Sequence, residues 1–205
     1  MKALVLALIA LAFASVVPAA SAQDSAQQAD LPERQVGDTW QYSYRDTRRN
    51  KPGSPFSVTV TEVTADGGFA VDIGGQKFFF GKGVGGVTTG AKSLEFVFPM
   101  KVGEAESYKA SDEALGLHWD FNVTRHVVTV EKVEVPAGTF DAFKIVFVNK
   151  YTGSAGFGAI SSGTITDTWW YAPAVKNFVK RTFSDDGDRA GSGLVVRELL
   201  KYQVQ

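Results

Sequence analysis

Hydrophobic and polar side chains alternate with a period of two along most of this chain, which is typical of β-strands with one covered face. In residues 39–45, the aromatic residues Trp40, Tyr42 and Tyr44 alternate with polar ones. Residues 117–124 repeat the pattern, with Leu, Trp, Phe and Val on one face and His, Asp, Asn and Thr on the other. Helical periodicity is scarce, and a short helical turn is predicted only within residues 111–115.

The same pattern predicts further strands and one irregularity. These strands cover residues 56–64, 69–73, 77–80, 94–98, 139–149, 164–171, 178–183 and 194–204. Val128 and Val130 share the parity of the polar positions Thr124 and His126. A bulge or bend near Arg125 is therefore predicted, because it would return both apolar sets to one core.

Turn residues separate these strands. Glycines in segments 66–68, 74–75 and 185–188 suit hairpin turns, and residues 135–138 suit a turn with Pro at the second position and Gly at the fourth. About ten strands at short spacing predict an all-β fold, an antiparallel meander that forms a barrel, a half-barrel or a sandwich. The pattern does not separate these three forms, since all present alternating strands.

The first 22 residues have the features of a cleaved secretory signal peptide. Lys2 precedes an apolar run over residues 3–17, and the small residues of segment 20–22 suit signal peptidase. The run is too short to span a bilayer comfortably, and the chain has no Cys to carry a lipid anchor. We therefore expect a periplasmic or secreted protein without a transmembrane span, with a flexible polar tail over residues 23–34 and a single all-β domain over residues 35–205.

Composition narrows the class of protein. Without Lys2, 20 Lys and Arg residues stand against 22 Asp and Glu residues, which is not the basic balance of a nucleic-acid-binding protein. The absence of Cys excludes disulfides, so burial of the 15 Phe, four Trp and six Tyr side chains must stabilise the fold.

Residues 133–145 (VEVPAGTFDAFKI), 170–173 (WYAP) and 179–181 (VKR) form a signature that resembles a group of exported bacterial β-rich proteins of unknown function. Residues 98–103 (FPMKVG) also resemble a strand start of that group, although Glu106 replaces its usual aromatic residue after the Gly. The resemblance covers the C-terminal half. It implies a secreted or periplasmic barrel-like domain and no catalytic or binding residue.

Two motifs suggest nucleotide or ester chemistry, but neither has the required context. Residues 81–86 satisfy the G-x-G-x-x-G pattern, yet no predicted helix follows to hold a pyrophosphate, so a β-loop is favoured. Segment 159–163 is a degenerate nucleophile elbow around Ser161, set in a Gly/Ser-rich loop. Only His118 and His126 are available as imidazole bases for a serine hydrolase.

Metal binding is the next alternative. His118 and Asp120 share the polar face of one strand, and His126 could add a third ligand if the chain bends near Arg125. A solvated polar face is the favoured interpretation of these residues. The aspartates of segment 185–188 lack the spacing of a calcium loop and suit a hairpin tip with Asx turns. No cofactor or metal is predicted.

Aromatic side chains are the better candidates for function. Trp170 shares a strand face with threonines, and Phe79 lies in a run of three Phe beside a Gly-rich segment, so both are predicted as ligand-binding residues. The preferred hypothesis is a non-enzymatic module that binds a lipid-like or amphipathic ligand. The alternative is an envelope structural or assembly factor that binds another protein through a sheet edge or the loop over residues 81–90. A hydrolase that uses Ser161 and His118 is the third hypothesis.

Overall fold

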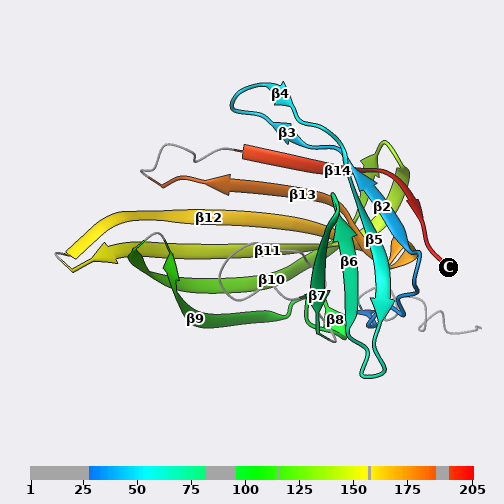
Figure 1. The fold of residues 1–205 in the computed structure, drawn as a ribbon, viewed down its shortest axis with the longest axis horizontal. Coiled ribbons are helices and arrows are strands. Elements are labelled where there is room, and N and C mark those ends of the chain that lie inside the picture. The colour runs from blue at the N-terminus through cyan, green and yellow to red at the C-terminus, as the bar shows by residue number, and fades with distance from the viewer. Residues whose placement is uncertain (1–27, 82–95, 115, 157, 188–193) are drawn as a thin grey trace, which may run out of the picture.

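The computed structural model describes residues 28–81, 96–114, 116–156, 158–187 and 194–205, most of which lie in antiparallel β-strands (Figure 1). The signal peptide predicted over residues 1–22 lies outside them. The first strands in chain order are β1 (Gln28–Ala29), β2 (Thr39–Tyr42), β3 (Arg45–Asp46), β4 (Lys51–Pro52), β5 (Phe56–Val63), β6 (Phe69–Ile73) and β7 (Gln76–Phe80). The remaining elements are β8 (Met100–Lys101), β9 (Ala105–Ala114), β10 (Leu117–Val135), β11 (Gly138–Ala155), β12 (Gly158–Ala172), the 3₁₀ turn η1 (Pro173–Val175), β13 (Asn177–Asp185) and β14 (Leu194–Gln203).

All the larger strands belong to one 12-stranded sheet with the order β7-β6-β5-β2-β14-β13-β12-β11-β10-β9, and the small strands β3 and β4 pair beside β14. The predicted all-β, antiparallel fold is confirmed. Among the described residues, the edge strands β7 and β9 do not pair with each other, so hydrogen bonds do not close the sheet into a barrel. Of the three forms left open by the sequence, the half-barrel describes this open sheet best.

The sheet turns a corner within β14. Residues 194–198 of β14 pair with β13, whereas residues 199–203 pair with β2. A register shift between Leu199 and Lys201 marks the change of direction, as bulges commonly do where a strand passes from one layer to another. In Figure 1 the long strands β9 to β13 consequently run horizontally, while β2, β5, β6 and β7 stand across one end of them.

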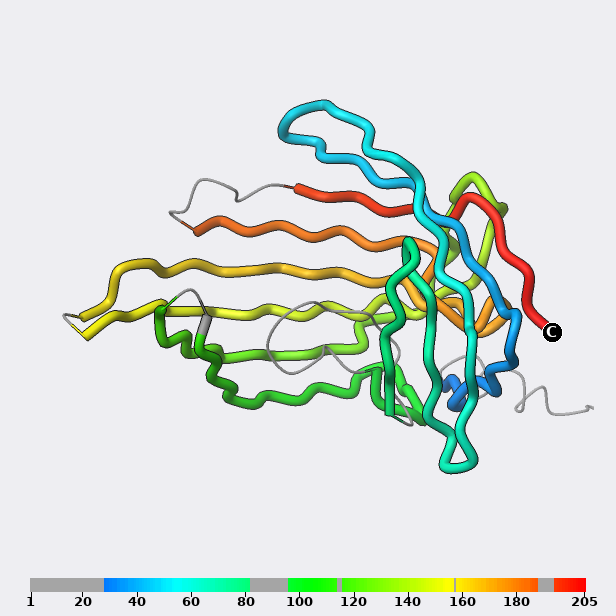
Figure 2. Tube along the Cα trace, viewed as in Figure 1, coloured from blue at the N-terminus to red at the C-terminus, as the bar shows by residue number. Residues whose placement is uncertain are grey.

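The turn between β10 and β11 brings that hairpin back to β14. The Ala137 N–H donates to the carbonyl oxygen of Leu199 at 3.0 Å, and the Phe140 ring packs edge-on against Tyr202 at 5.9 Å between centroids. Figure 2 shows the hairpin tip rising beside the C-terminal part of β14. The predicted turn over residues 135–138 is confirmed, with Gly138 at a φ of 133° that disfavours other residues. This contact curls the sheet at one end.

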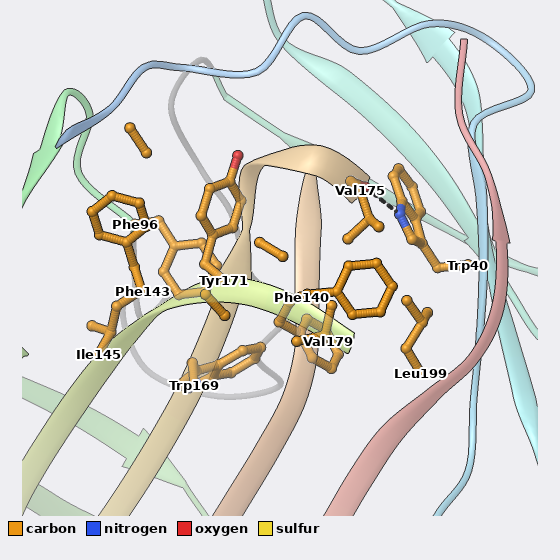
Figure 3. Close-up of a cluster of buried hydrophobic side chains, with 14 of the residues drawn as sticks. Trp40, Phe96, Phe140, Phe143, Ile145, Trp169, Tyr171, Val175, Val179 and Leu199 are labelled. Carbon is orange, nitrogen blue, oxygen red and sulfur yellow. Dashed lines mark hydrogen bonds between the residues drawn. The ribbon is translucent and has the colours of Figure 1, made fainter. Parts of the chain in front are cut away.

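The core lies where the short strands cross the long ones. The side chains of Trp40 and Tyr42, on β2, are completely buried there. The Trp40 indole N–H donates to the Val175 carbonyl at 2.7 Å (Figure 3). The Tyr42 hydroxyl donates to the Phe178 carbonyl at 2.9 Å. Burial also raises the pKa of the Tyr42 hydroxyl well above its ordinary value, so it stays a donor at any ordinary pH.

A buried carboxylate joins the two ends of the described chain. Asp38 accepts the backbone N–H of Gln35 and of Gln205, both at 3.0 Å. The Lys176 ammonium lies 3.8 Å from the same carboxylate and donates to the Gln205 carbonyl at 2.6 Å. Asp38 is therefore fully buried but well compensated, and it holds the chain beyond β14 against the start of β2.

The predicted flexible tail over residues 23–34 is wrong from residue 28 onward. Gln28 and Ala29 pair with Lys101 and Met100, and the Ala29 side chain is buried. Further along, the Arg34 guanidinium lies 4.5 Å from the centre of the Phe69 ring. An alanine and the aliphatic part of an arginine side chain can both cover apolar surface. The prediction of a tail from polar composition did not take this into account.

Three other sequence predictions need correction. Residues 111–114 belong to β9 and not to a helical turn. Because β9 is an edge strand that pairs only with β10 in the described sheet, its polar side chains can stay exposed to solvent. The bulge predicted near Arg125 occurs at Val128, between the pairs formed by Val127 and Thr129. Of the strand predicted over residues 94–98, the described residues 96–98 are not in a strand, and the next strand is β8.

The Tyr42 hydroxyl offers a test of the corner. Tyr42→Phe keeps the ring but leaves the buried Phe178 carbonyl without this donor, so we expect a loss of about 1–2 kcal/mol in the free energy of unfolding, measured by urea titration. Tyr202→Phe is the control, because Tyr202 is 41% exposed and its expected change is under about 0.5 kcal/mol. Equal effects of the two substitutions would contradict this account.

Candidate functional site

The candidate site is the part of the inner face that lies beyond the short strands. The inner face is the side of the long strands that carries Trp169 and Tyr171, both of which are buried in the core. The short strands cross only one end of the long strands (Figure 1). Further along, the inner face carries apolar side chains that we call the distal apolar face. Trp119, Val123 and Tyr151 are buried, whereas Phe121, Ile165 and Phe183 are half-buried.

Two glycines shape the distal apolar face. The Trp119 ring lies over Gly153, where a Cβ would come within 2.7 Å of the indole. Tyr151 lies in the same way against Gly163, where a Cβ would come within 2.6 Å of its hydroxyl oxygen. Both contacts require glycine, and they let large aromatic rings lie flat along the sheet. Trp119 and Tyr151 also contact each other, with 5.8 Å between ring centroids.

Polar side chains lie on the inner face where the distal apolar face meets the core. We call them the polar belt: Arg125, Asn149, Asp167, Arg181 and Arg197. Cross-strand pairing places them on the inner face, because Arg125 and Asp167 both pair with Phe147, and Arg181 pairs with both Trp169 and Arg197. The inner face thus combines apolar, cationic and polar side chains beside the closed core.

Two of the three belt arginines have carboxylate partners. Arg181 binds Asp167 through two hydrogen bonds, from Nε at 2.9 Å and from Nη2 at 2.6 Å. The Arg181 guanidinium also lies 4.2 Å from the centre of the Trp169 ring. Arg125 Nη2 lies 3.4 Å from the Glu106 carboxylate on β9. A two-point arginine–carboxylate pair is strong and directional, so it fixes Arg181 in place.

Arg197 differs from the other two. Within the described residues, no carboxylate lies within ion-pair distance of its guanidinium. It lies 5.3 Å from the Phe56 ring and 5.9 Å from the Tyr44 ring instead. Burial lowers the pKa of Arg197 and the positive charge of Arg181 lowers it further, whereas the more distant negative charge of Asp167 partly opposes this shift. Arg197 is thus a half-buried cation without an opposite charge in contact with it.

Several buried polar atoms on this face lack a hydrogen-bond partner among the described residues. They are Arg125 Nε, Asn149 Oδ1, Trp169 Nε1, the Tyr171 hydroxyl and Arg197 Nε. All five belong to the inner face by strand pairing. Buried polar atoms are nearly always paired, so this concentration on one face is what a site for a polar ligand group would require.

Trp170, predicted to bind ligand, lies on the opposite face of β12 from Trp169. Its indole N–H donates to Glu131 at 2.6 Å, and the Lys144 and Lys180 ammonium groups lie 5.5 and 5.8 Å from its ring centre. Lys180 in turn lies 3.1 Å from Glu198. These residues form a ladder of charged groups across five strands, β10 to β14. Trp170 is half-buried, as its threonine neighbours suggested, and its polar atom is already satisfied.

Phe79, the other predicted ligand-binding residue, points away from the core. Its neighbours Phe78 and Phe80 pack against the core, whereas Phe79 is 70% exposed. The Lys77 ammonium lies 5.1 Å from its ring and forms an exposed ion pair with Glu62 at 2.7 Å. No hydrogen bond or ring contact brings Phe79 and Trp170 together in the described residues. Most of the Gly-rich segment 81–90 lies outside those residues.

The weaker chemical candidates do not assemble into a site. Trp119, Gly153 and Ser161 pair directly across the sheet, so Ser161 faces inward while His118 faces outward, and the two cannot form a serine–histidine pair. His118 and His126 lie eight residues apart on unbroken β10, about 26 Å at 3.3 Å per residue. No group of three or more His, Asp or Glu residues in the described chain is placed to hold a metal ion. Asp185 accepts the Gly187 N–H at 2.9 Å, which confirms an Asx turn there.

The belt arginines were missed at the sequence level, although a signal exists. Arg125 has the same parity as Trp119 and Val123, so strict alternation places it inside. The bulge was predicted near Arg125 in order to return Val128 and Val130 to the core, and the face of Arg125 itself was not considered. Because the bulge actually follows Val127, Arg125 stays on the inner face and is 6% exposed.

Comparison with known proteins gives a likeness of fold. No protein family matches the sequence, and neither does any curated protein. A candidate lipoprotein of known structure from Parabacteroides distasonis aligns with a TM-score of 0.53 and 15% identity, over 85% of this chain and 98% of that one. A candidate exported protein with a YmcC-like fold from Bacteroides fragilis aligns with a TM-score of 0.43 and 15% identity, over 85% of this chain and 99% of that one. In the described part of the chain, no helix has the length and hydrophobicity to cross a membrane.

The outward-facing His118 allows a test of the geometry at the β9–β10 hairpin. A hydrogen bond with Glu113 at 2.7 Å raises the pKa of His118 above its ordinary value of 6.5, and Asp120 at 3.3 Å adds to this. We expect Glu113→Gln to lower that pKa, as measured by NMR titration, and Glu134→Gln to leave it unchanged. The hairpin contact should be strongest at acidic pH and weaken as pH rises through the raised pKa. A His118 pKa unaffected by Glu113→Gln would contradict the geometry.

Proposed function

We propose that this protein is an exported, non-enzymatic binding module that holds a lipid-like or amphipathic ligand on the inner face of its long strands. The observation that supports this most is the adjacency of the distal apolar face and the polar belt. An amphipathic molecule has one apolar part and one polar part, and the two regions offer a matching surface for each. The buried unpartnered polar atoms of the belt add donors and an acceptor for a polar group.

Export is part of the proposal. It is supported by the N-terminal sequence, which has the basic start, apolar run and small-residue site of a signal peptide. The structural relative from Parabacteroides distasonis is described as a candidate lipoprotein, a class found outside the cytoplasm. The resemblance of residues 133–145, 170–173 and 179–181 to a signature of exported β-rich proteins is consistent with this. In the fold the first part of this signature forms the β10–β11 hairpin that contacts β14, which suggests a folding role for that motif.

Binding to the distal apolar face can be tested with a matched pair of substitutions. Protein purified from its native host should carry a ligand that native mass spectrometry detects, and delipidated protein should gain thermal stability when the extracted ligand is returned. Phe121→Ser removes apolar surface from the inner face and should weaken binding about tenfold. Asn122→Ser changes an exposed position on the opposite face and should have no effect. No retained ligand and no thermal shift would count against the proposal.

A second candidate function is an assembly factor that binds another envelope protein. It is favoured by the edge strand β7, which pairs only with β6 in the described sheet and exposes Phe79. Free edges with exposed apolar side chains are common sites for strand addition by a partner. On this proposal Phe79 contacts a protein and not the ligand of the inner face.

Site-specific crosslinking separates the two candidates. A photoreactive residue in place of Phe79 should give one reproducible crosslinked protein in the native host. The same residue in place of Asp141, which is exposed on β11, should give none. If neither position crosslinks while the thermal shift is observed, the result supports the binding module and contradicts the assembly factor.

A further inference from the structure

We infer that the ligand is an amphiphile with an anionic headgroup, and that Arg197 is the residue that binds this headgroup. The inference rests on the proposed binding function and specifies its ligand class. It follows from the charge balance of the polar belt, from the position of Arg197 beside the distal apolar face, and from the unpaired Nε of its side chain.

The first step is the missing opposite charge. Arg181 is neutralised by Asp167, with N–O distances of 2.9 and 2.6 Å, and Arg125 lies 3.4 Å from Glu106. Arg197 stands directly opposite Arg181 in the pairing of β13 with β14. No described carboxylate lies within ion-pair distance of Arg197, and Asp167, which is bound to Arg181, acts on it only from further away. A cation withdrawn from water beside a second cation is unfavourable unless an anion offsets it. An anionic group at Arg197 would supply that charge.

The surroundings of Arg197 hold its guanidinium without neutralising it. The rings of Phe56 and Tyr44 lie 5.3 and 5.9 Å away, and aromatic faces attract a guanidinium but carry no net charge. The guanidinium is thereby oriented before a ligand arrives. Its planar set of N–H donors suits the oxygens of a carboxylate or a phosphate, whereas an uncharged hydroxyl would leave the charge uncompensated.

The second step is the direction in which the alkyl chain of the ligand would extend from Arg197. Phe183 pairs with Val195 on the strands next to Arg181 and Arg197, so the distal apolar face begins two residues from the cation. From the level of Trp169 to that of Ser161, which pairs through Gly153 with Trp119, the inner face extends about 26 Å at 3.3 Å per residue. A headgroup at Arg197 therefore places an alkyl chain along the half-buried side chains of Phe183 and Ile165.

The experiment compares three probes of one chain length, used below the concentrations at which they form micelles: oleate, oleyl phosphate and oleyl alcohol. Delipidated wild-type protein should bind both anions at least about tenfold more tightly than the alcohol, measured by calorimetry. Arg197→Gln should remove that difference while leaving the alcohol affinity unchanged, and Arg197→Lys should keep part of it. Lys180→Gln, which removes a cation from the opposite face, is the control and should preserve the difference.

The outcomes separate the two proposals. If none of the probes binds, both the binding function and this inference are wrong. If all three bind wild-type protein equally, or if Arg197→Gln keeps the preference for anions, only the assignment of the headgroup to Arg197 fails. A preference for oleate over oleyl phosphate identifies a carboxylate headgroup, and the reverse identifies a phosphate. Should Arg197→Gln not fold, as judged by circular dichroism, the wild-type preference and the Arg197→Lys variant decide the question.

Discussion

The architecture depends on two buried hydrogen bonds at the corner of the sheet. Trp40 and Tyr42 donate to the backbone carbonyls of Val175 and Phe178, and both side chains are completely buried. Apolar contact alone would allow the short strands to slide across the long ones, because hydrophobic attraction has no direction. A donor that must meet one particular carbonyl fixes the crossing, since a shift would leave polar atoms buried and unpaired. The orientation of the inner face follows from this crossing.

Most of the fold could be predicted from the sequence, because a strand with one buried face alternates hydrophobic and polar side chains. The strand predicted over residues 69–73 was found unchanged as β6, and the others, apart from that predicted over residues 94–98, differed mainly at their ends. The strand β9 was missed because an edge strand held by backbone hydrogen bonds needs no apolar face. The burial of Ala29 was missed for a different reason. It depends on β8, which lies far away in the sequence, and no local pattern reports such a contact.

The candidate site was much less predictable. Aromatic residues drew attention to Trp170 and Phe79, but one is satisfied by Glu131 on the opposite face and the other lies at a sheet edge. The polar belt is built from residues of five strands, β10 to β14, and the pairing of these strands decides which arginine meets which carboxylate. From local sequence alone, each arginine would be predicted to be exposed to solvent. Only the register of the sheet reveals that three of them face inward and that one has no opposite charge.

The double role of β14 bears on how the molecule is made. Its residues complete both the long-strand layer and the short-strand layer. In addition, Asp38 accepts a hydrogen bond from Gln205, which lies 167 residues later in the chain. Such distant pairings slow folding, because the entropy of closing large loops must be overcome before native contacts form. The native fold therefore cannot be completed until residues 194–205 have been synthesised. Such late completion suits the proposed export, because a chain must be unfolded to pass through a narrow translocation channel.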